Sequence, residues 1–212
     1  MTTQFSDDEI DALGERLRLS DASSDWGAYR DYQGRLDELR QNLEEELRSL
    51  ASDAEIASRT KRLETVVAKL RRRPELALSQ VTDLAGCRII VSGRMEQIAI
   101  VGGLQSIYDV QQVDDKSDSP KFGYRAVHLD IRYQGQLMEI QVQTRNQFRW
   151  QQVSEYAAGS DVAIKYGGGL PEVGQALLEL SELAYQCDLD GVELSETDIA
   201  RVHSVIALAH SG

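Results

Sequence analysis

The 212-residue sequence has little that could build a cross-linked, metal-rich or membrane-spanning protein. Its only cysteines, Cys87 and Cys187, lie far apart, which excludes a disulfide framework and a cysteine-based zinc site. Its three histidines are too few for a histidine-rich metal centre. No apolar run reaches the roughly 18 residues of a transmembrane helix, and the acidic N-terminus lacks the apolar segment of a secretory signal. We therefore expect a protein of the reducing cytoplasm that needs no membrane partner.

The sequence also lacks the familiar glycine-rich phosphate loops, GxxxxGK[ST] and GxGxxG. Its composition, 42% hydrophobic and 27% charged, is nevertheless that of a folded globular chain and not of a disordered one. Its length suits one compact domain. Within that domain we expect an N-terminal helical segment (1–55), a core (56–170) and a C-terminal helical segment (171–212).

The charge is unevenly distributed along the chain. Residues 1–55 carry a net charge of -9 and residues 171–212 one of -7, whereas residues 56–170 carry +4. A basic centre between acidic flanks suits a small anionic ligand better than a long duplex, which would meet the flanks. We therefore expect no DNA partner.

Two helices are predicted in the first third of the chain. Residues 34–50 place leucines at spacings of three and four, which is typical of an amphipathic helix. Residues 52–55 resemble a new N-cap, so we expect a second helix from there to Arg73, before Pro74. Its cations would lie roughly along one side: Arg59, Arg62, Lys69 and Arg73. Such a side is either a solvated surface with ion pairs or a cradle for a triphosphate.

The remainder of the chain alternates strand and helix patterns, which predicts an α+β fold. We expect a mixed, mostly antiparallel sheet of about five strands flanked by helices. Strands are predicted over 87–91, 108–113, 126–133 and 137–144, the last two as a hairpin around Gln134 and Gly135; helices are predicted over 95–107, after 144 and, in two pieces, from Pro171.

The hairpin has an apolar and a polar face. A two-residue turn would place Asp130 opposite Glu139 and His128 opposite Gln141 on the polar face. Two opposed carboxylates repel, and a divalent cation or a basic partner would relieve that repulsion. The alternative is the solvated outer face of an antiparallel sheet.

The loop before the hairpin combines cations with an aromatic side chain. Lys116, Lys121 and Arg125 lie near Tyr124, a combination suited to stacking on a base and contacting phosphate. The alternative is a surface loop with one half-buried tyrosine.

Four motifs in order resemble the synthetase domain of the RelA/SpoT alarmone synthetase family. They are Asp83-Leu-Ala-Gly86-Cys-Arg88, Gly123-Tyr124-Arg125-Ala-Val-His128, Glu139-Ile-Gln141-Val-Gln143-Thr144 and Trp150. The resemblance covers roughly residues 25–172 and implies a nucleotidyltransferase-like synthetase core. That family transfers pyrophosphate from ATP to the 3′-hydroxyl of a guanosine nucleotide (GDP or GTP), making (p)ppGpp with Mg²⁺.

The resemblance also implies roles for individual residues. Asp83 and Glu139 match the catalytic, metal-binding acids. The ATP site is expected to comprise Arg59 or Arg62 and Arg88 around adenine, with Lys69 on phosphate and Lys61 in the same basic segment. The acceptor site is expected to comprise Tyr124, stacked on the base, with Lys116, Lys121, Arg125, His128 and Gln141.

Three departures from the family pattern leave other functions open. The loop before Tyr124 is short, Gln143 replaces an arginine, and Ser154-Glu155-Tyr156 replaces Glu-His. The stretches Tyr124-Arg-Ala-Val-His128 and Ser154-Glu155 look more like the toxic small-synthetase branch, some members of which modify the tRNA 3′ end or adenosine nucleotides. A toxin with an antitoxin partner and a degenerate nucleotide-binding regulator are the alternatives. The length predicts a stand-alone small synthetase, with homo-oligomers possible.

Overall fold

The computed structural model describes residues 5–19, 23–160 and 162–209. The helices are α1 (Asp7–Leu19), α2 (Ser23–Leu50), α3 (Leu63–Arg72), α4 (Arg94–Ile107), α5 (Arg145–Ser160), α6 (Pro171–Asp190) and α7 (Glu196–Ala209). The strands are β1 (Glu55–Thr60), β2 (Ala85–Val91), β3 (Asp109–Asp115), β4 (Val127–Tyr133) and β5 (Gln136–Thr144). Short 3₁₀ turns η1 (Leu78–Gln80), η2 (Thr82–Leu84) and η3 (Val162–Tyr166) complete the list. No helix in these described ranges is both long and apolar enough to cross a membrane.

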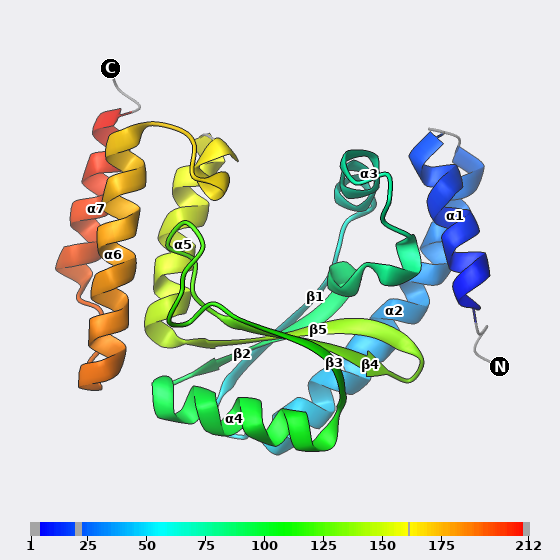
Figure 1. Ribbon diagram of the computed structural model, residues 1–212, viewed down its shortest axis with the longest axis horizontal. Helices are drawn as coiled ribbons and strands as arrows, with labels where there is room; N and C mark the ends of the chain where they lie inside the picture. The colour runs from blue at the N-terminus through cyan, green and yellow to red at the C-terminus, as the bar shows by residue number, and fades with distance from the viewer. Residues whose placement is uncertain (1–4, 20–22, 161, 210–212) are drawn as a thin grey trace. The chain divides into compact units, whose positions relative to one another are not determined.

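The strands form one five-stranded mixed sheet in the order β1-β2-β5-β4-β3 (Figure 1). The expected α+β fold is therefore confirmed. Because β2 and β5 are neighbours in the sheet but not in the sequence, the central pairing depends on long-range contacts.

The predicted hairpin is confirmed as β4 and β5. Its turn residues Gln134 and Gly135 have φ angles of 47° and 88°, the left-handed pair that a two-residue hairpin turn requires. The apolar side chains of both strands are buried: Val127, Leu129, Ile131, Met138, Ile140 and Val142. Alternation and turn chemistry therefore set this register locally.

The single helix expected from residue 52 to Arg73 is wrong. Residues 55–60 form β1, and a helix begins only at Leu63. The hydroxyl groups of Ser58 and Thr60 donate hydrogen bonds to carboxylates of α2, those of Glu44 and Asp37 respectively. These contacts, together with pairing to β2, favour an extended segment over a helix.

The predicted basic helix face is wrong for the same reason. Arg59 is on β1, Arg62 is the residue before α3, Lys69 is in its last turn, and Arg73 follows it. The four cations therefore come from a strand, a helix and the two residues that flank that helix.

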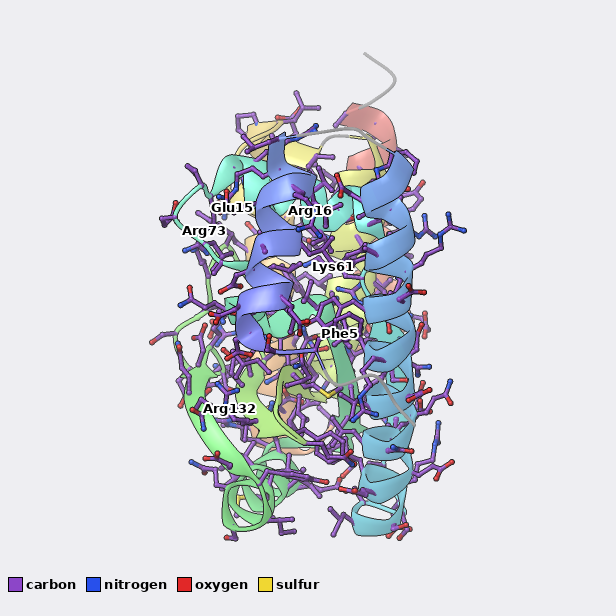
Figure 2. The ribbon with its side chains drawn as sticks, turned by 90° about the vertical axis from the view of Figure 1, so that its right-hand side faces the viewer. Phe5, Glu15, Arg16, Lys61, Arg73 and Arg132 are labelled. Carbon is purple, nitrogen blue, oxygen red and sulfur yellow. The ribbon has the colours of Figure 1, made fainter. Side chains whose placement is uncertain are left out.

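The chain divides into two compact units, which are described separately. The first unit comprises residues 1–89, 104–113 and 128–141. In it, α2 packs against β1 (Figure 1). The leucines of the predicted 34–50 pattern are buried: Leu36, Leu39, Leu43 and Leu47. Helix α1 lies beside α2 (Figure 2). Arg16 of α1 pairs with Asp25 of α2. Helix α2 begins eleven residues before the predicted 34–50 pattern.

The second unit comprises residues 90–103, 114–127 and 142–212. Helices α5, α6 and α7 pack on one another around Trp150, Leu177 and Val202 (Figure 1). Helix α6 ends where predicted, with Gly191 in the left-handed conformation at its C-terminus. The division into segments 1–55, 56–170 and 171–212 stays a prediction.

Candidate active site

Asp83 is held by two lysines in the first unit. Both of its carboxylate oxygens accept hydrogen bonds, one from Lys61 and one, at 2.8 Å, from the Nζ atom of Lys69. Burial alone would raise the pKa of Asp83, but the two lysines hold it below its ordinary value. The side chain is thus a carboxylate at neutral pH, with two cations beside it.

Glu139 is the second acid of this region. Its Oε1 atom lies 3.0 Å from Nδ1 of His128, and its Oε2 atom accepts a hydrogen bond from the Gln141 amide. Burial opposes ionisation of Glu139, but these two contacts hold its pKa below the ordinary value. The sequence predicted all three residues as site residues, and the structure brings them together.

Arg88 joins the predicted donor residues to the predicted acceptor residues. Its Nε and Nη2 atoms donate to Oε1 of Gln141, at 3.3 and 3.2 Å. A single pocket is lined by residues that include Asp83, Arg88, Glu139 and Gln141. A polar chain therefore runs from Arg88 through Gln141 to Glu139 and His128 beside the Asp83 carboxylate.

Arg59 and Arg62 were alternatives for one role. Arg59 is exposed on β1 and lines the same pocket, together with Ala57 and Ser58. Arg62 is exposed just before α3, and it is not among the described residues that line this pocket. The geometry therefore favours Arg59 as the arginine that a ligand in the pocket would meet.

Gly86 is required by the close packing of two central strands. A Cβ atom at this position would lie 2.3 Å from the carbonyl oxygen of Glu139. No side chain larger than hydrogen fits there unless β2 or β5 shifts. Gly86 thus fixes how closely the strand bearing Arg88 approaches the strand bearing Glu139.

The sequence patterns did not predict Asp130 as a site residue, although repulsion between Asp130 and Glu139 was expected. The carboxylate of Asp130 is half-buried and accepts a hydrogen bond from Thr82. Burial raises its pKa, and the nearby negative charge of Glu139 adds to that increase. Thr82 holds Asp130, while His128 and Gln141 hold Glu139, so protein groups offset part of the expected repulsion. The sequence feature that could have identified Asp130 is its position on the polar face of the alternating 126–133 strand.

Asp83 and Glu139 were also predicted to bind Mg²⁺. Both are hard oxygen donors that line one pocket, and Mg²⁺ is usually bound by one or two carboxylates plus substrate phosphates. Within the described residues no group of three or more His, Cys, Asp or Glu side chains could hold a metal alone. This donor set fits an ion that shares its coordination with a nucleotide.

Four further predicted acceptor residues belong to the second unit. Tyr124 is partly buried, with its ring centroid 6.3 Å from that of Trp150. Lys121 is exposed, and Lys116 pairs with Asp114. Arg125, in contrast, is only 5% exposed and donates three hydrogen bonds to described residues of its own unit. Sequence reasoning predicted Arg125 as a ligand contact and missed this burial.

Residues 58–166, just over half of the chain, match the family described as the region found in RelA / SpoT proteins. The chain belongs to the RelA/SpoT family. It is 36% identical over 123 residues to the uncharacterized protein Rv1366 of Mycobacterium tuberculosis and to a counterpart in Mycobacterium bovis. The alignment covers 57% of this chain and 43% of either relative, so the chain spans less than half the length of those proteins.

Solved structures of similar proteins have the same fold. The small alarmone synthetase 1 of Bacillus subtilis bound to its product pppGpp is 25% identical, with a TM-score of 0.59 over 75% of this chain and 90% of that one. A GTP pyrophosphokinase family protein of Streptococcus pneumoniae is 19% identical, with a TM-score of 0.68 over 86% and 97%. The second likeness concerns the fold alone.

Proposed function

We propose that this RelA/SpoT chain is a pyrophosphokinase that transfers the β,γ-pyrophosphate of ATP to the 3′-hydroxyl of GDP or GTP. The observation that carries the proposal is the pocket in which Asp83, held by Lys61 and Lys69, lines the same walls as Glu139. The pppGpp named as the product of the 25% identical relative supports a guanosine acceptor.

The basic groups that line the pocket or contact Asp83 suit the donor ATP. Lys61 and Lys69 carry the charge needed to neutralise a triphosphate, and both already contact Asp83. Arg59 and Arg88 come from β1 and β2 and line the pocket, and planar guanidinium groups of this kind suit stacking on adenine. These four residues form our proposed ATP site.

The reaction follows from the positions of the acids. The acceptor 3′-oxygen attacks the β-phosphorus of ATP, the bond from that phosphorus to the α,β-bridging oxygen breaks, and AMP leaves. Glu139 is ionised, so it can accept a hydrogen bond from the attacking hydroxyl and orient it, while His128 at 3.0 Å can share the released proton. A Mg²⁺ ion bound by Asp83 and Glu139 would neutralise charge on the phosphates.

The loop cations favour a nucleotide acceptor over the tRNA 3′ end. A tRNA would be held by several phosphate contacts, for which Lys116, Lys121 and Arg125 were the candidates. Lys116 pairs with Asp114, and Arg125 is buried against Glu182. Two of the three cations are thus engaged with acids, which leaves less positive charge for an RNA backbone.

The proposal is tested by incubating the chain with ATP labelled on its γ-phosphate and, separately, GDP, GTP, ADP or deacylated tRNA. We expect label on GDP or GTP, with activity that falls only gradually as salt increases. Label on tRNA alone, lost steeply with salt, would instead support the toxin alternative. Nucleotide binding without any transfer would support the degenerate regulator.

A further inference from the structure

Tyr124 lies at the end of a tight turn in the second unit. Lys121 and Tyr124 exchange backbone hydrogen bonds of 3.3 and 3.0 Å across Phe122 and Gly123, whose φ angles are 54° and 84°. Left-handed backbone at Phe122 is uncommon for a residue with a side chain and persists only where the surroundings hold it. The turn is therefore fixed from outside.

Helix α6 provides part of that support. The Ser181 hydroxyl donates a 2.6 Å hydrogen bond to the carbonyl oxygen of Gly123. A Cβ atom at Gly123 would lie 2.7 Å from Trp150 and 3.3 Å from the Cβ of Ser181, so the turn is in close contact with both residues. Trp150 in turn donates a 2.7 Å hydrogen bond to the carbonyl oxygen of Leu177 on α6.

Arg125 completes the attachment on the other side of Tyr124. Its guanidinium donates to Ser181 Oγ at 3.1 Å, to the Ser117 carbonyl at 2.5 Å and to Glu182 Oε2 at 3.0 Å. The guanidinium also lies over the Tyr185 ring, 4.5 Å from its centroid. Three directed hydrogen bonds and a stacking contact use the planar fork of arginine in a way that lysine could not.

The two attachments lie on either side of Tyr124 in the sequence. Gly123 is joined to Ser181 by its carbonyl, and Arg125 is joined to Ser181 and Glu182 by its side chain. The Tyr124 ring rests against Trp150, which is itself joined to α6. The backbone and ring of Tyr124 are thus positioned by α6, whose contacting residues Ser181 and Glu182 are more than fifty positions further along the chain.

We propose that Arg125, Ser181 and Glu182 are positioning residues for the acceptor site and not ligand contacts. They hold Tyr124 against Trp150 and α6, so that its partly buried ring is already fixed when the acceptor base arrives. This inference deepens the proposed function and rests on it, because it assumes that Tyr124 stacks on the acceptor base. Pre-organisation of this kind lowers the entropy lost on binding and so acts on acceptor affinity.

The test uses three α6 variants and one variant of the stacking residue in the full chain. Glu182→Ala and Ser181→Ala remove separate parts of the attachment, and Glu179→Ala is the matched control. Glu179 lies less than one turn earlier on α6, also pairs with an arginine (Arg201, 3.6 Å), and has no recorded bond to the 121–125 turn among the described residues. Tyr124→Ala measures the full effect of losing the ring that is proposed to stack on the acceptor base.

Two readouts separate positioning from a merely structural role. We expect Glu182→Ala and Ser181→Ala to raise the acceptor KM about five- to tenfold, leave the ATP KM within about twofold, and accelerate amide exchange at Tyr124. Glu179→Ala should change none of these. Faster amide exchange at Tyr124 without a change in acceptor KM would overturn the inference. Equal increases in the KM values for acceptor and ATP, together with a lower Tm, would also overturn it.

The Tyr124→Ala variant distinguishes failure of this inference from failure of the proposed function. If Tyr124→Ala raises the acceptor KM while Ser181→Ala and Glu182→Ala behave like the control, only the positioning inference is wrong. If Tyr124→Ala leaves acceptor KM unchanged, the proposed acceptor site is wrong and the inference is overturned with it. If wild-type protein transfers nothing, the affinity for GDP, measured by calorimetry, replaces KM in the same comparison.

Discussion

The Nδ1 atom of His128 lies 3.0 Å from the Oε1 atom of Glu139, within the polar face of the β4–β5 hairpin. Neither side chain is fully solvated, since they are 17% and 15% exposed. The pair therefore belongs to a recessed polar site and not to the solvated outer face that was one alternative for this hairpin. Its location beside the Asp83 pocket makes Glu139 the first residue to test.

Glu139→Gln and Asp83→Asn should each reduce pyrophosphate transfer by about 100-fold or more. Loss of one acid removes about 3 kcal/mol of transition-state stabilisation in a charge-neutralising site. The measurement is the initial rate of label transfer from ATP to GDP, with circular dichroism to confirm folding. Glu38→Gln, the same change at an exposed α2 carboxylate paired with Arg35, is the control and should retain full activity. Near-wild-type transfer by either folded variant would refute the site assignment.

Asp83 should also contribute stability that depends on pH. Its pKa is lowered in the folded protein, so its ion pairs stabilise the fold above the unfolded pKa and are lost as pH falls through the folded pKa. Asp83→Asn, which resembles the protonated side chain, should be about 1 kcal/mol less stable than wild type near pH 7. The two unfolding free energies, measured by urea denaturation, should converge below about pH 4. A gap of constant size across this range would show that the lysine pairs do not stabilise the carboxylate.

Lys69→Ala should raise the KM for ATP by about tenfold, because it removes one charged contact to the triphosphate. The KM for the acceptor should stay within about twofold of the wild-type value. Arg73→Ala is a suitable control, since Arg73 is exposed just after α3 and pairs with Glu75. Unchanged ATP binding in Lys69→Ala combined with lost affinity for long RNA would mean that this segment binds nucleic acid.

Gly86→Ala should both destabilise the fold and slow the reaction. The new Cβ would lie 2.3 Å from the Glu139 carbonyl, and overpacking of this kind costs about 1–3 kcal/mol. Gly103→Ala is the control, because a Cβ on this exposed α4 glycine meets nothing within 4 Å and should stabilise the helix by about 0.5–1 kcal/mol. Thermal unfolding of both variants gives the comparison. An unchanged Tm for Gly86→Ala would disprove the tight β2–β5 approach.

Tyr124→Ala should weaken acceptor use by about 1–3 kcal/mol, roughly 5- to 150-fold in acceptor kcat/KM, whereas Tyr124→Phe should change it little. The difference arises because phenylalanine keeps the aromatic face and loses only the hydroxyl. Steady-state kinetics with GDP at saturating ATP provide the measurement. Equal defects in the two variants would indicate that the hydroxyl, and not stacking, is the main contact.

The sequence predicted well those features that are encoded locally. The β4–β5 hairpin followed from strict alternation and from Gln134-Gly135, and the ending of α6 followed from Gly191. It failed at β1, where the spacing of Arg59 and Lys69 also fits a helix. The extended conformation there depends on pairing with β2 and on hydroxyl contacts from Ser58 to α2, which no local pattern reveals.

The candidate site divides in the same way. Asp83, Glu139, Arg88 and Gln141 were identified through ordered motifs, and the structure brings them to one pocket. The burial of Arg125 could not be predicted, because its partner Glu182 is 57 positions away and α6 offered no signal of that contact. A cation beside a tyrosine gives the same sequence pattern whether it binds phosphate or a neighbouring helix.

The most direct test of the central claim is the fate of the two labels when ATP is labelled separately on its α- and γ-phosphates and incubated with GDP. Pyrophosphate transfer predicts that the γ-label appears on the guanosine product, that the α-label appears only in AMP, and that AMP and product form in equal amounts. Release of ADP with inorganic phosphate, or AMP without a labelled guanosine product, would contradict the account.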